Sequence, residues 1–420
     1  MHTRRGVRLK KWHWGLRLLT RRMWFRAGLF CAFAIGLALA SAVIGHVISY
    51  DFATKVGARS VDSILNVLAS SMLAVTTFSL TAMVSAYSGA TSNITPRAVQ
   101  LLVEDSTAQN ALATFLGSFL FAIVGIIALS TGFYGESGRV ILLGGTILVI
   151  ASIVVTFLRW IEHITRFGRV SDTIARVEKA AGGAARSLGR PPCFGPRKRR
   201  SVPDGATSIH LEEIGRITHV DFALLQDVAK DIEGQIVLSA LPGVMADPAR
   251  MVAWTTARID TAQIDRLRSA FTVAPDRAFD NDPRFGLVVL SEIASRALSP
   301  AVNDPGTAIS VLEAGTRVLC SIVNMEENES ETDTDRVIVP SLSFPELLED
   351  FYRPIARDGA GQIEVAVRLQ KSLAALAVLG PAARADCANV AADAMTRALT
   401  AMTAEADREL LERIHRRYWR

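Results

Sequence analysis

The chain has 420 residues, of which half are hydrophobic and 21% are charged. That charge content excludes collagen-like, fibrous and globally disordered chains, and four cysteines without paired spacing exclude a disulfide scaffold or a zinc ribbon. Lys and Arg exceed Asp and Glu by only 46 to 41, but these charges are unevenly placed along the chain. The gaps between them predict a membrane protein.

Four segments carry no Asp, Glu, Lys or Arg: residues 27–50, 63–96, 106–135 and 140–158. A helix needs about 20 mainly apolar residues to cross a hydrocarbon core about 30 Å thick. We therefore predict four transmembrane helices, at residues 27–49, 63–87, 110–132 and 140–160.

The basic residues predict the orientation of these helices. Residues 1–26 contain nine Lys and Arg and no acid, and residues 159–200 contain eleven against three acids. Positively charged flanks stay inside, so we expect a multi-pass membrane protein with both termini cytoplasmic. Anionic lipid is the partner expected at these basic segments. Nucleic acid is not expected, because neither aromatic interleaving nor a known module accompanies them.

A cleaved signal is the alternative for the first span. Residues 20–25 contain Arg21-Arg22 and resemble a twin-arginine signal, and residues 38–40 resemble a cleavage site. We favour a retained span, because the apolar run continues well past the small residues. Cleavage would leave the orientation of the other three spans unchanged.

The second span carries a polar stripe at spacings of three, four or seven residues, which place its members on one helical face. The stripe residues are Ser63, Asn66, Ser70, Thr77, Thr81 and Ser85, followed by Ser88. One interpretation is an interface with another helix, held by hydroxyl groups. The other is the lining of a water-filled path in an oligomer. The stripe is therefore a candidate pore or helix interface, and we expect a homo-oligomer.

The predicted fold class is mostly α: a four-helix transmembrane region followed by a cytoplasmic α+β domain. Alternating β-branched residues predict strands within 209–220 and 235–241 around a helix at 222–232, and the pattern is helical after residue 247. The predicted parts are a basic cytoplasmic N-terminus (1–26), a transmembrane domain (27–160), a basic linker (161–207), a small β-rich module (208–246) and a helical cytoplasmic domain (247–420).

Three Asp-Pro pairs predict helix starts, with Asp as N-cap and Pro at the first helical position. They begin at Asp247, Asp282 and Asp304, and Ser343 with Glu346 predicts a capping box. The predicted helices are 259–270, 283–298, 305–324, 344–357, 361–379 and 382–416.

The segment from 280 to 308 contains an unusual combination of residues. It includes Asp282, Pro283, Glu292, Arg296, Asn303, Asp304 and Pro305 within DNDPRFGL, SEIASRALSP and AVNDPGTA. This segment resembles the signature of a bacterial family of predicted membrane proteins, domain of unknown function 2254. Glu292 replaces the usual Asp, Val302 the usual Ile, and Gly306 a bulkier residue. The resemblance covers most of the chain and implies a prokaryotic plasma-membrane protein, without implying an activity.

From the residues alone, this signature is a pair of capped helices joined by a turn. Glu292 and Arg296 are spaced to pair on one helix face. Asp280, Asp282, Asn303 and Asp304 offer oxygens for a hard cation, but helix caps and turns explain them more simply, so we predict no metal site. The sequence contains none of the common nucleotide-binding, hydrolase or zinc-protease motifs, so we predict no catalytic residues, no cofactor and no enzyme.

Two functions remain as hypotheses. The first is a channel-like oligomer gated by its cytoplasmic domain, with the polar stripe lining the path. The alternative is a membrane-anchored sensor or scaffold whose cytoplasmic domain binds a ligand or a partner.

Overall fold

The computed structural model describes Phe25, residues 28–29, 31–33 and 35–36, and then residues 60–131, 136–188, 194–195, 201–325 and 336–419. It divides into unit 1, which comprises residues up to 92 and 99–169, and unit 2, which comprises residues 93–98 and 170–420. The first predicted span, 27–49, lies mostly outside the described residues. Those of its residues that are described are helical.

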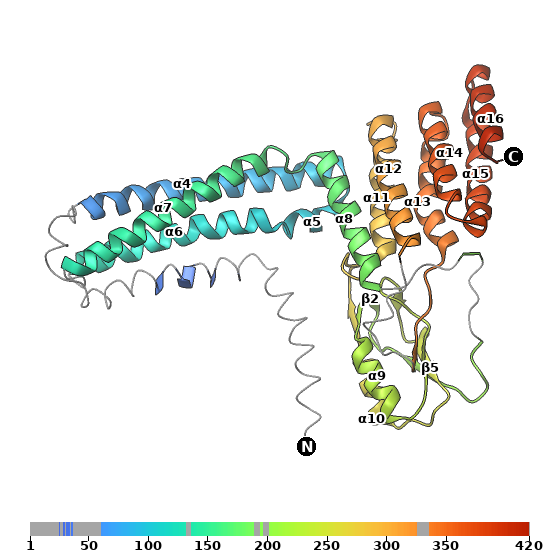
Figure 1. Cartoon of the computed structure of the whole chain (residues 1–420), viewed down its shortest axis with the longest axis horizontal. Helices are drawn as coiled ribbons and strands as arrows, with labels where there is room; N and C mark the ends of the chain where they lie inside the picture. The colour runs from blue at the N-terminus through green and yellow to red at the C-terminus, as the bar shows by residue number, and fades with distance from the viewer. Residues whose placement is uncertain are drawn as a thin grey trace. The chain divides into compact units, whose positions relative to one another are not determined.

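From residue 60 on, the described part of unit 1 is helical (Figure 1). Its long helices are α4 (Ser60–Asn93), α6 (Ser106–Ser130) and α7 (Glu136–Ile164), and the short helix α5 (Val99–Val103) precedes α6. The helices predicted at 63–87, 110–132 and 140–160 correspond to α4, α6 and α7. Asp105 caps α6, because its carboxylate accepts a hydrogen bond from the backbone nitrogen of Ala108 at 2.8 Å.

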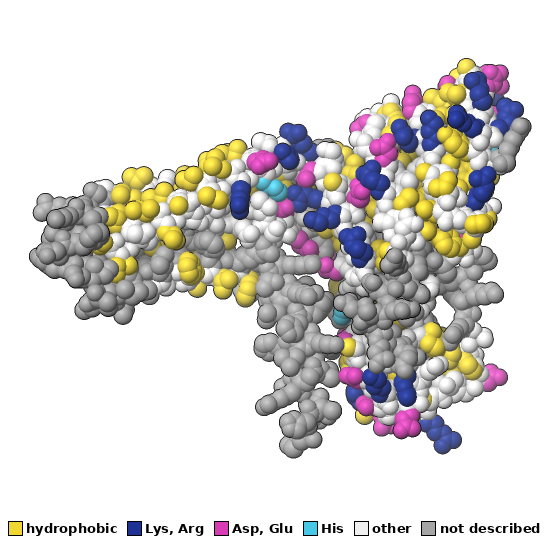
Figure 2. Space-filling view, viewed as in Figure 1, with side chains coloured by type: hydrophobic (Ala, Val, Ile, Leu, Met, Phe, Trp, Pro, Cys, Tyr) yellow, Lys and Arg dark blue, Asp and Glu magenta, His cyan; other side chains and the backbone are white. Residues whose placement is uncertain are grey.

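Large apolar side chains remain exposed on unit 1. Val67, Phe78, Ile147 and Leu158 are each between 60% and 68% exposed. Figure 2 shows hydrophobic side chains spread over the described face of this unit, with charged side chains gathered near one end of it. An exposed apolar surface of this extent is unusual for a soluble protein and is expected for helices that contact lipid.

Four described helices are long and apolar enough to cross a membrane: α4, α6, α7 and α12 (Pro305–Val323). The last one lies in unit 2, where we predicted a helix outside the membrane. Its Arg317 pairs with Glu178 at 2.7 Å and its Glu313 pairs with Arg368 at 3.3 Å. A helix packed inside a helical layer is apolar on most of its surface, which explains why α12 has a composition similar to that of a span.

Unit 2 contains two sheets. The strands are β1 (Thr207–His210), β2 (Gly215–Val220), β3 (Ile236–Leu238), β4 (Met245–Ala246), β5 (Met251–Thr255), β6 (Phe271–Ala274) and β7 (Val337–Ile338). The four-stranded sheet has the order β1-β5-β3-β7, with β3 and β7 parallel, and the three-stranded sheet has the antiparallel order β4-β2-β6.

The predicted boundary at residue 246 between a β-rich module and a helical domain is wrong. Strands β5 and β6 follow it, and β5 lies inside the larger sheet. Asp247-Pro248 does not start a helix, because the Asp247 carboxylate accepts bonds from the backbone nitrogens of Ala249 and Arg250 in a tight turn. An Asp-Pro pair forms such a turn as readily as a helix start, and the buried strand that follows decides between them.

The remaining helices of unit 2 are η2 (Pro96–Ala98), α8 (Val170–Leu188), α9 (Phe222–Asp231), α10 (Thr261–Arg268), α11 (Pro283–Ala297), α13 (Phe344–Asp358), α14 (Ile363–Ala377), α15 (Pro381–Ala401) and α16 (Glu405–Trp419). Helices α8 and α11 to α16 pack together in one helical array, in which α11 contacts α8, α12 and α13, and α14 contacts α12, α15 and α16 (Figure 1). The helix predicted at 382–416 is divided, because Met402 adopts an extended conformation between α15 and α16.

Helix α8 lies within the segment predicted as a basic linker, 161–207. It packs against α11 and α12. The approach to α11 is close, because a Cβ at Gly286 would collide with Ala181. The signature glycine therefore brings the α8 and α11 backbones together.

Candidate functional site

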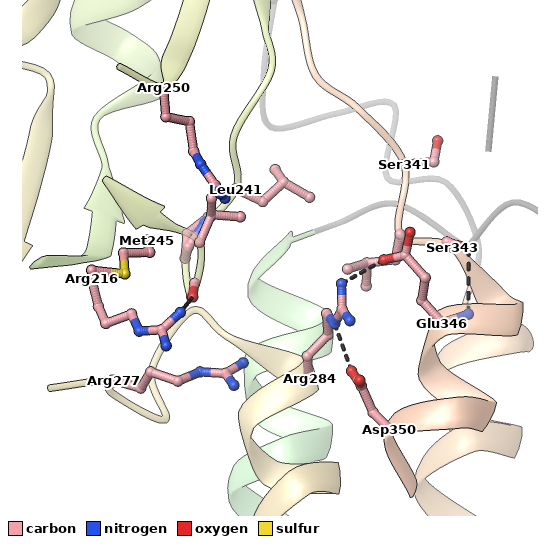
Figure 3. Close-up of a pocket in the computed structure, with 14 residues that line it drawn as sticks. Arg216, Leu241, Met245, Arg250, Arg277, Arg284, Ser341, Ser343, Glu346 and Asp350 are labelled. Carbon is pink, nitrogen blue, oxygen red and sulfur yellow. Dashed lines mark hydrogen bonds and ion pairs between the residues drawn. The ribbon is translucent and has the colours of Figure 1, made fainter. Parts of the chain in front are cut away.

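A cavity of about 340 Å³ lies in unit 2 between the strands and the helices. It is lined by Arg216 of β2, Arg250 before β5, Arg277 before α11 and Arg284 of α11. Glu346 and Asp350 of α13 also line it, together with Ser341 and Ser343. In Figure 3, Arg216, Arg250 and Arg277 enter from the strand side, and Arg284 faces them from the helices. Four guanidinium groups from separate elements therefore share one small cavity.

Arg277 is held by a buried carboxylate. Its Nε donates to Oδ2 of Asp282 at 2.7 Å, and its guanidinium group stacks on Phe285 at 5.0 Å from the ring centre. The Asp282 side chain is only 3% exposed and also caps α11 by accepting from the backbone nitrogen of Phe285. Burial raises the pKa of Asp282, and the hydrogen bond from Arg277 opposes that shift. Arg277 is thus fixed in position at the cavity wall.

Gly243 makes this arrangement possible. Its φ is +91°, a conformation that favours glycine, and a Cβ at this position would collide with the Asp282 carboxylate. The backbone of the Leu241-Pro242-Gly243 turn can therefore approach the start of α11. The carbonyl oxygen of Gly243 accepts a hydrogen bond from Nη1 of Arg216 at 3.1 Å.

Arg284 is paired on two sides. Its Nε donates to Asp350 at 2.7 Å and its Nη1 to Glu346 at 2.5 Å. Ser343 caps α13, as predicted, with its hydroxyl 3.4 Å from the backbone nitrogen of Glu346. The Glu346 side chain turns to Arg284, so the other half of the predicted capping box is replaced by an ion pair between α11 and α13.

Arginines outnumber carboxylates on the lining itself, by four to two, but two further carboxylates pair with them from just outside it. Asp282 pairs with Arg277 and Asp247 lies 3.7 Å from Arg250, so the formal charges of the whole group cancel. Among the described residues, no carboxylate lies within ion-pair distance of Arg216. The cavity is therefore suited to an anionic ligand.

The signature residue Glu292 lies further along α11. Its carboxylate accepts hydrogen bonds from Thr95, at 3.1 Å, and from Arg97. The predicted pairing of Glu292 with Arg296 is replaced by these contacts. Residues 93–98 connect α4 to α5 and belong to unit 2, with Ile94 and Ala98 buried. The connection between two candidate spans is thus held on the same helix that lines the cavity.

The other signature residues form a cap and a turn. Asp304 caps α12 by accepting from the Thr307 backbone nitrogen at 3.0 Å and from its hydroxyl at 2.6 Å. These hydrogen bonds lower the pKa of Asp304. Asn303 has φ +49° and its side chain accepts a hydrogen bond from Gln362 at 2.8 Å. Within the part of the chain that the structure describes, no three His, Cys, Asp or Glu side chains group closely enough to hold a metal ion.

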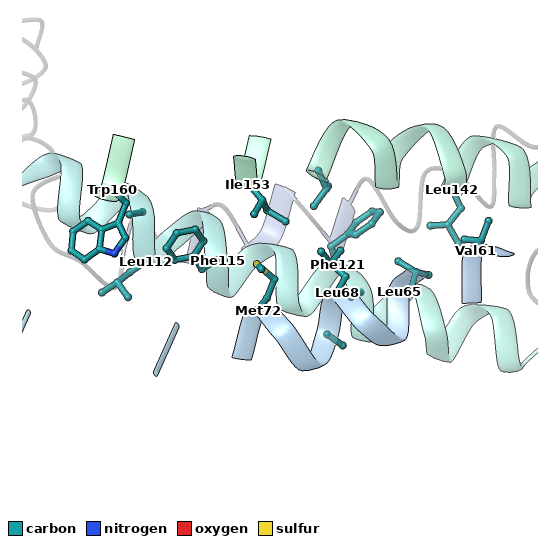
Figure 4. Packing of buried hydrophobic residues seen from close by; sticks show 14 of the residues in the cluster. Val61, Leu65, Leu68, Met72, Leu112, Phe115, Phe121, Leu142, Ile153 and Trp160 are labelled. Atoms are coloured by element: carbon teal, nitrogen blue, oxygen red, sulfur yellow. The ribbon is translucent and has the colours of Figure 1, made fainter. Parts of the chain in front are cut away.

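The polar stripe of α4 is exposed in the single chain. Its six predicted residues, Ser63, Asn66, Ser70, Thr77, Thr81 and Ser85, are all exposed. The Ser70, Thr77 and Thr81 hydroxyls bond to backbone carbonyls one turn earlier, at 3.0 Å each. The opposite face of α4, with Val61, Leu65, Leu68 and Met72, packs into the apolar cluster of unit 1 (Figure 4). The stripe thus belongs to the face of α4 directed away from that cluster.

Sequence reasoning missed two features. The cavity arginines lie in four separate segments, and no local spacing connects them. The second feature is a pair in unit 1, where Nε2 of His163 lies 3.0 Å from Asp105, with side chains 16% and 8% exposed. Trp160 and Phe167 contact the His163 ring. This pair joins the end of α7 to the start of α6 and is explained by packing of the helix ends.

The sequence pattern of one protein family matches residues 20–375. The family is described as "Predicted membrane protein (DUF2254)", and because the match covers most of the chain, this protein belongs to that family. Comparison with curated proteins and with solved structures gave no match.

Proposed function

We propose that this member of the DUF2254 family is a membrane-anchored sensor whose unit 2 binds a small anionic ligand. The observation that carries the proposal is the cavity lined by four arginines, of which Arg216 has no carboxylate within ion-pair distance among the described residues. Its volume of about 340 Å³ is at the small end of the range of ligand sites, which is about 300 to 1,000 Å³. A binding role is favoured over catalysis, because both carboxylates of the lining are engaged with Arg284.

Helix α11 would transmit the effect of ligand binding from the cavity to residues 93–98. Arg284 lines the cavity, and Glu292 holds residues 93–98 eight positions later, about 12 Å along the helix axis. A ligand that shifts the first turn of α11 would change how the connection between α4 and α5 is held. The proposal includes the predicted orientation, with both termini and unit 2 on the cytoplasmic side of the inner membrane.

Hydrogen exchange of the full-length protein in nanodiscs tests this proposal without knowledge of the ligand. Ser341→Trp fills the cavity and imitates occupancy, whereas Ser201→Trp adds the same side chain at an exposed position outside the lining. We expect Ser341→Trp to alter exchange at residues 93–98 and in the adjoining turns of α4 and α5. Unaltered exchange there, with altered exchange around the cavity, would contradict the sensor.

A channel-like homo-oligomer is the second candidate, and it is supported by the exposure of the polar stripe on α4. In an oligomer this face would meet another copy or line a path. Thr77→Val with Thr81→Val preserves shape and removes two hydroxyls. A lining role predicts a large loss of ion flux in liposomes with the oligomer intact, because an apolar constriction loses its water. Absence of flux from the unmodified protein, with several ions and both polarities, would exclude the channel.

A further inference from the structure

We propose that the cavity binds the phosphoryl group of a phosphate monoester through Arg216 and Arg277, an inference that rests on the proposed sensor function. Each of the two arginines donates one hydrogen bond to the surrounding protein, Arg216 to the Gly243 carbonyl and Arg277 to Asp282. A guanidinium group has five N–H donors, so each keeps several for a ligand. Figure 3 shows both side chains extended toward the Arg284 side of the cavity.

The arginines of the lining favour a phosphoryl group. Arg216 has no carboxylate partner among the described residues and Arg277 keeps N–H donors beyond the one bonded to Asp282, while a phosphate monoester at neutral pH carries about −1.5 to −2 on one group. Arginine binds phosphate and carboxylate oxygens in bidentate fashion. A dicarboxylate carries the same charge on two separate groups, whereas Arg216 and Arg277 approach one region of the cavity.

The opposite wall supplies weaker donors. The Ser341 and Ser343 side chains line the cavity just before the first turn of α13, a helix of 15 residues. The positive end of the α13 dipole lies beside the same space, but Glu346 in its first turn offsets it, so Arg216 and Arg277 supply the main attraction for an anion. Arg284 contributes charge but few free donors, since it is engaged by Asp350 and Glu346.

Titration of the full-length protein in detergent with inorganic phosphate and with glycerol 3-phosphate tests this inference, with succinate as the dicarboxylate. We expect both phosphates to raise the unfolding temperature and succinate to bind more weakly. Arg216→Gln should weaken phosphate binding by about ten- to one-hundredfold, the usual effect of losing a charged hydrogen bond. Arg216 is the best variant because it has no carboxylate partner among the described residues, so its loss leaves no buried acid unpaired.

Arg266→Gln is the matched control. Arg266 lies on α10, pairs with Asp231 at 2.6 Å, and is not part of the lining. Its removal should leave phosphate affinity unchanged. Arg216→Lys keeps the charge but loses bidentate geometry, and an intermediate affinity is expected.

The phosphoryl group of a lipid is the other source of the same chemistry. Nanodiscs with and without phosphatidic acid separate the two sources, and binding of the lipid alone, lost in Arg216→Gln, would assign the site to a lipid headgroup. Equal binding of succinate, phosphate affinity unchanged in Arg216→Gln, or no binding of any phosphate would overturn the inference. In each of these cases the exchange experiment with Ser341→Trp would still decide the sensor proposal by itself.

Discussion

Asp282 and Asp304 occupy the same position in two helices, since each is an N-cap followed by proline. They differ in burial, because the Asp282 side chain is 3% exposed and paired with Arg277, whereas Asp304 is exposed and its side chain accepts hydrogen bonds from Thr307 of its own helix. Asp282→Ala should lower the free energy of unfolding by about 3 kcal/mol or more, because it leaves Arg277 unpaired at the cavity wall.

Asp304→Ala is the matched control and should cost about 1 kcal/mol, the usual value for an N-cap. Thermal unfolding of both full-length variants in detergent measures the difference. Equal losses would mean that the buried ion pair contributes nothing beyond the cap.

His219 provides a pH-dependent contribution to stability. Burial lowers its pKa below 6.5, and the charges of Asp221 and Asp280 oppose this shift only in part. The unfolded chain therefore takes up the proton at a higher pH than the folded protein, so stability falls as pH drops below about 6.5. His219→Gln should reduce the loss of unfolding temperature between about pH 7.5 and about pH 5.5. An identical loss in both proteins would assign the effect to other groups.

Among the elements, the packing of α8 against α11 depends on Gly286. Gly286→Val would force these helices apart, because a side chain there collides with Ala181, and should cost about 1 to 3 kcal/mol or prevent folding. Gly183→Ala on α8 meets open space and should be neutral or stabilising by up to about 1 kcal/mol. Comparison of expression and unfolding temperature of the two variants tests this, and equal behaviour would contradict it.

The sequence predicted best those elements whose defining residues lie close together in the chain. The start of α11 at Asp282-Pro283 and of α12 at Asp304-Pro305 depends on residues within one turn, and α6 and α7 depend on continuous apolar runs. Helix α8 was missed because its Gly182-Gly183 pair and basic residues are typical of a linker. Its buried residues, such as Ile174 and Val177, follow a helical spacing, which is the signal that could have found it.

At the scale of the whole molecule, the cavity could not be predicted from sequence. Its arginines are up to 68 positions apart, from Arg216 on β2 to Arg284 on α11, and the other two lie in separate connecting segments. The close approach of Gly243 to Asp282 helps to bring the strand and helix walls together. The signature segment did contain part of the site. Its Asp282 positions Arg277 at the cavity wall, and its Glu292 bonds to Thr95 further along α11. Such long-range contacts leave no periodicity in a single sequence.

The predicted orientation can be tested with single cysteines, introduced one at a time into a variant that lacks the four native cysteines. Cysteine at Ala58 or Ser137 should react with a membrane-impermeant thiol reagent in intact cells, because both connections are predicted to face outward. Cysteine at Ala206 should react only after permeabilisation. Labelling of the Ala206 position in intact cells would place unit 2 on the outer side and contradict the orientation.

The central claim is that occupancy of the cavity is coupled to residues 93–98 through α11. Coupling between sites is reciprocal, so weakening the hold of Glu292 on Thr95 and Arg97 must change the affinity of the cavity for its ligand. The direct measurement is the affinity of the full-length protein for glycerol 3-phosphate in Glu292→Gln, with Glu313→Gln on α12 as the control. The account predicts a change of about fivefold or more in Glu292→Gln and none in the control. The same affinity in Glu292→Gln as in the unmodified protein would contradict it.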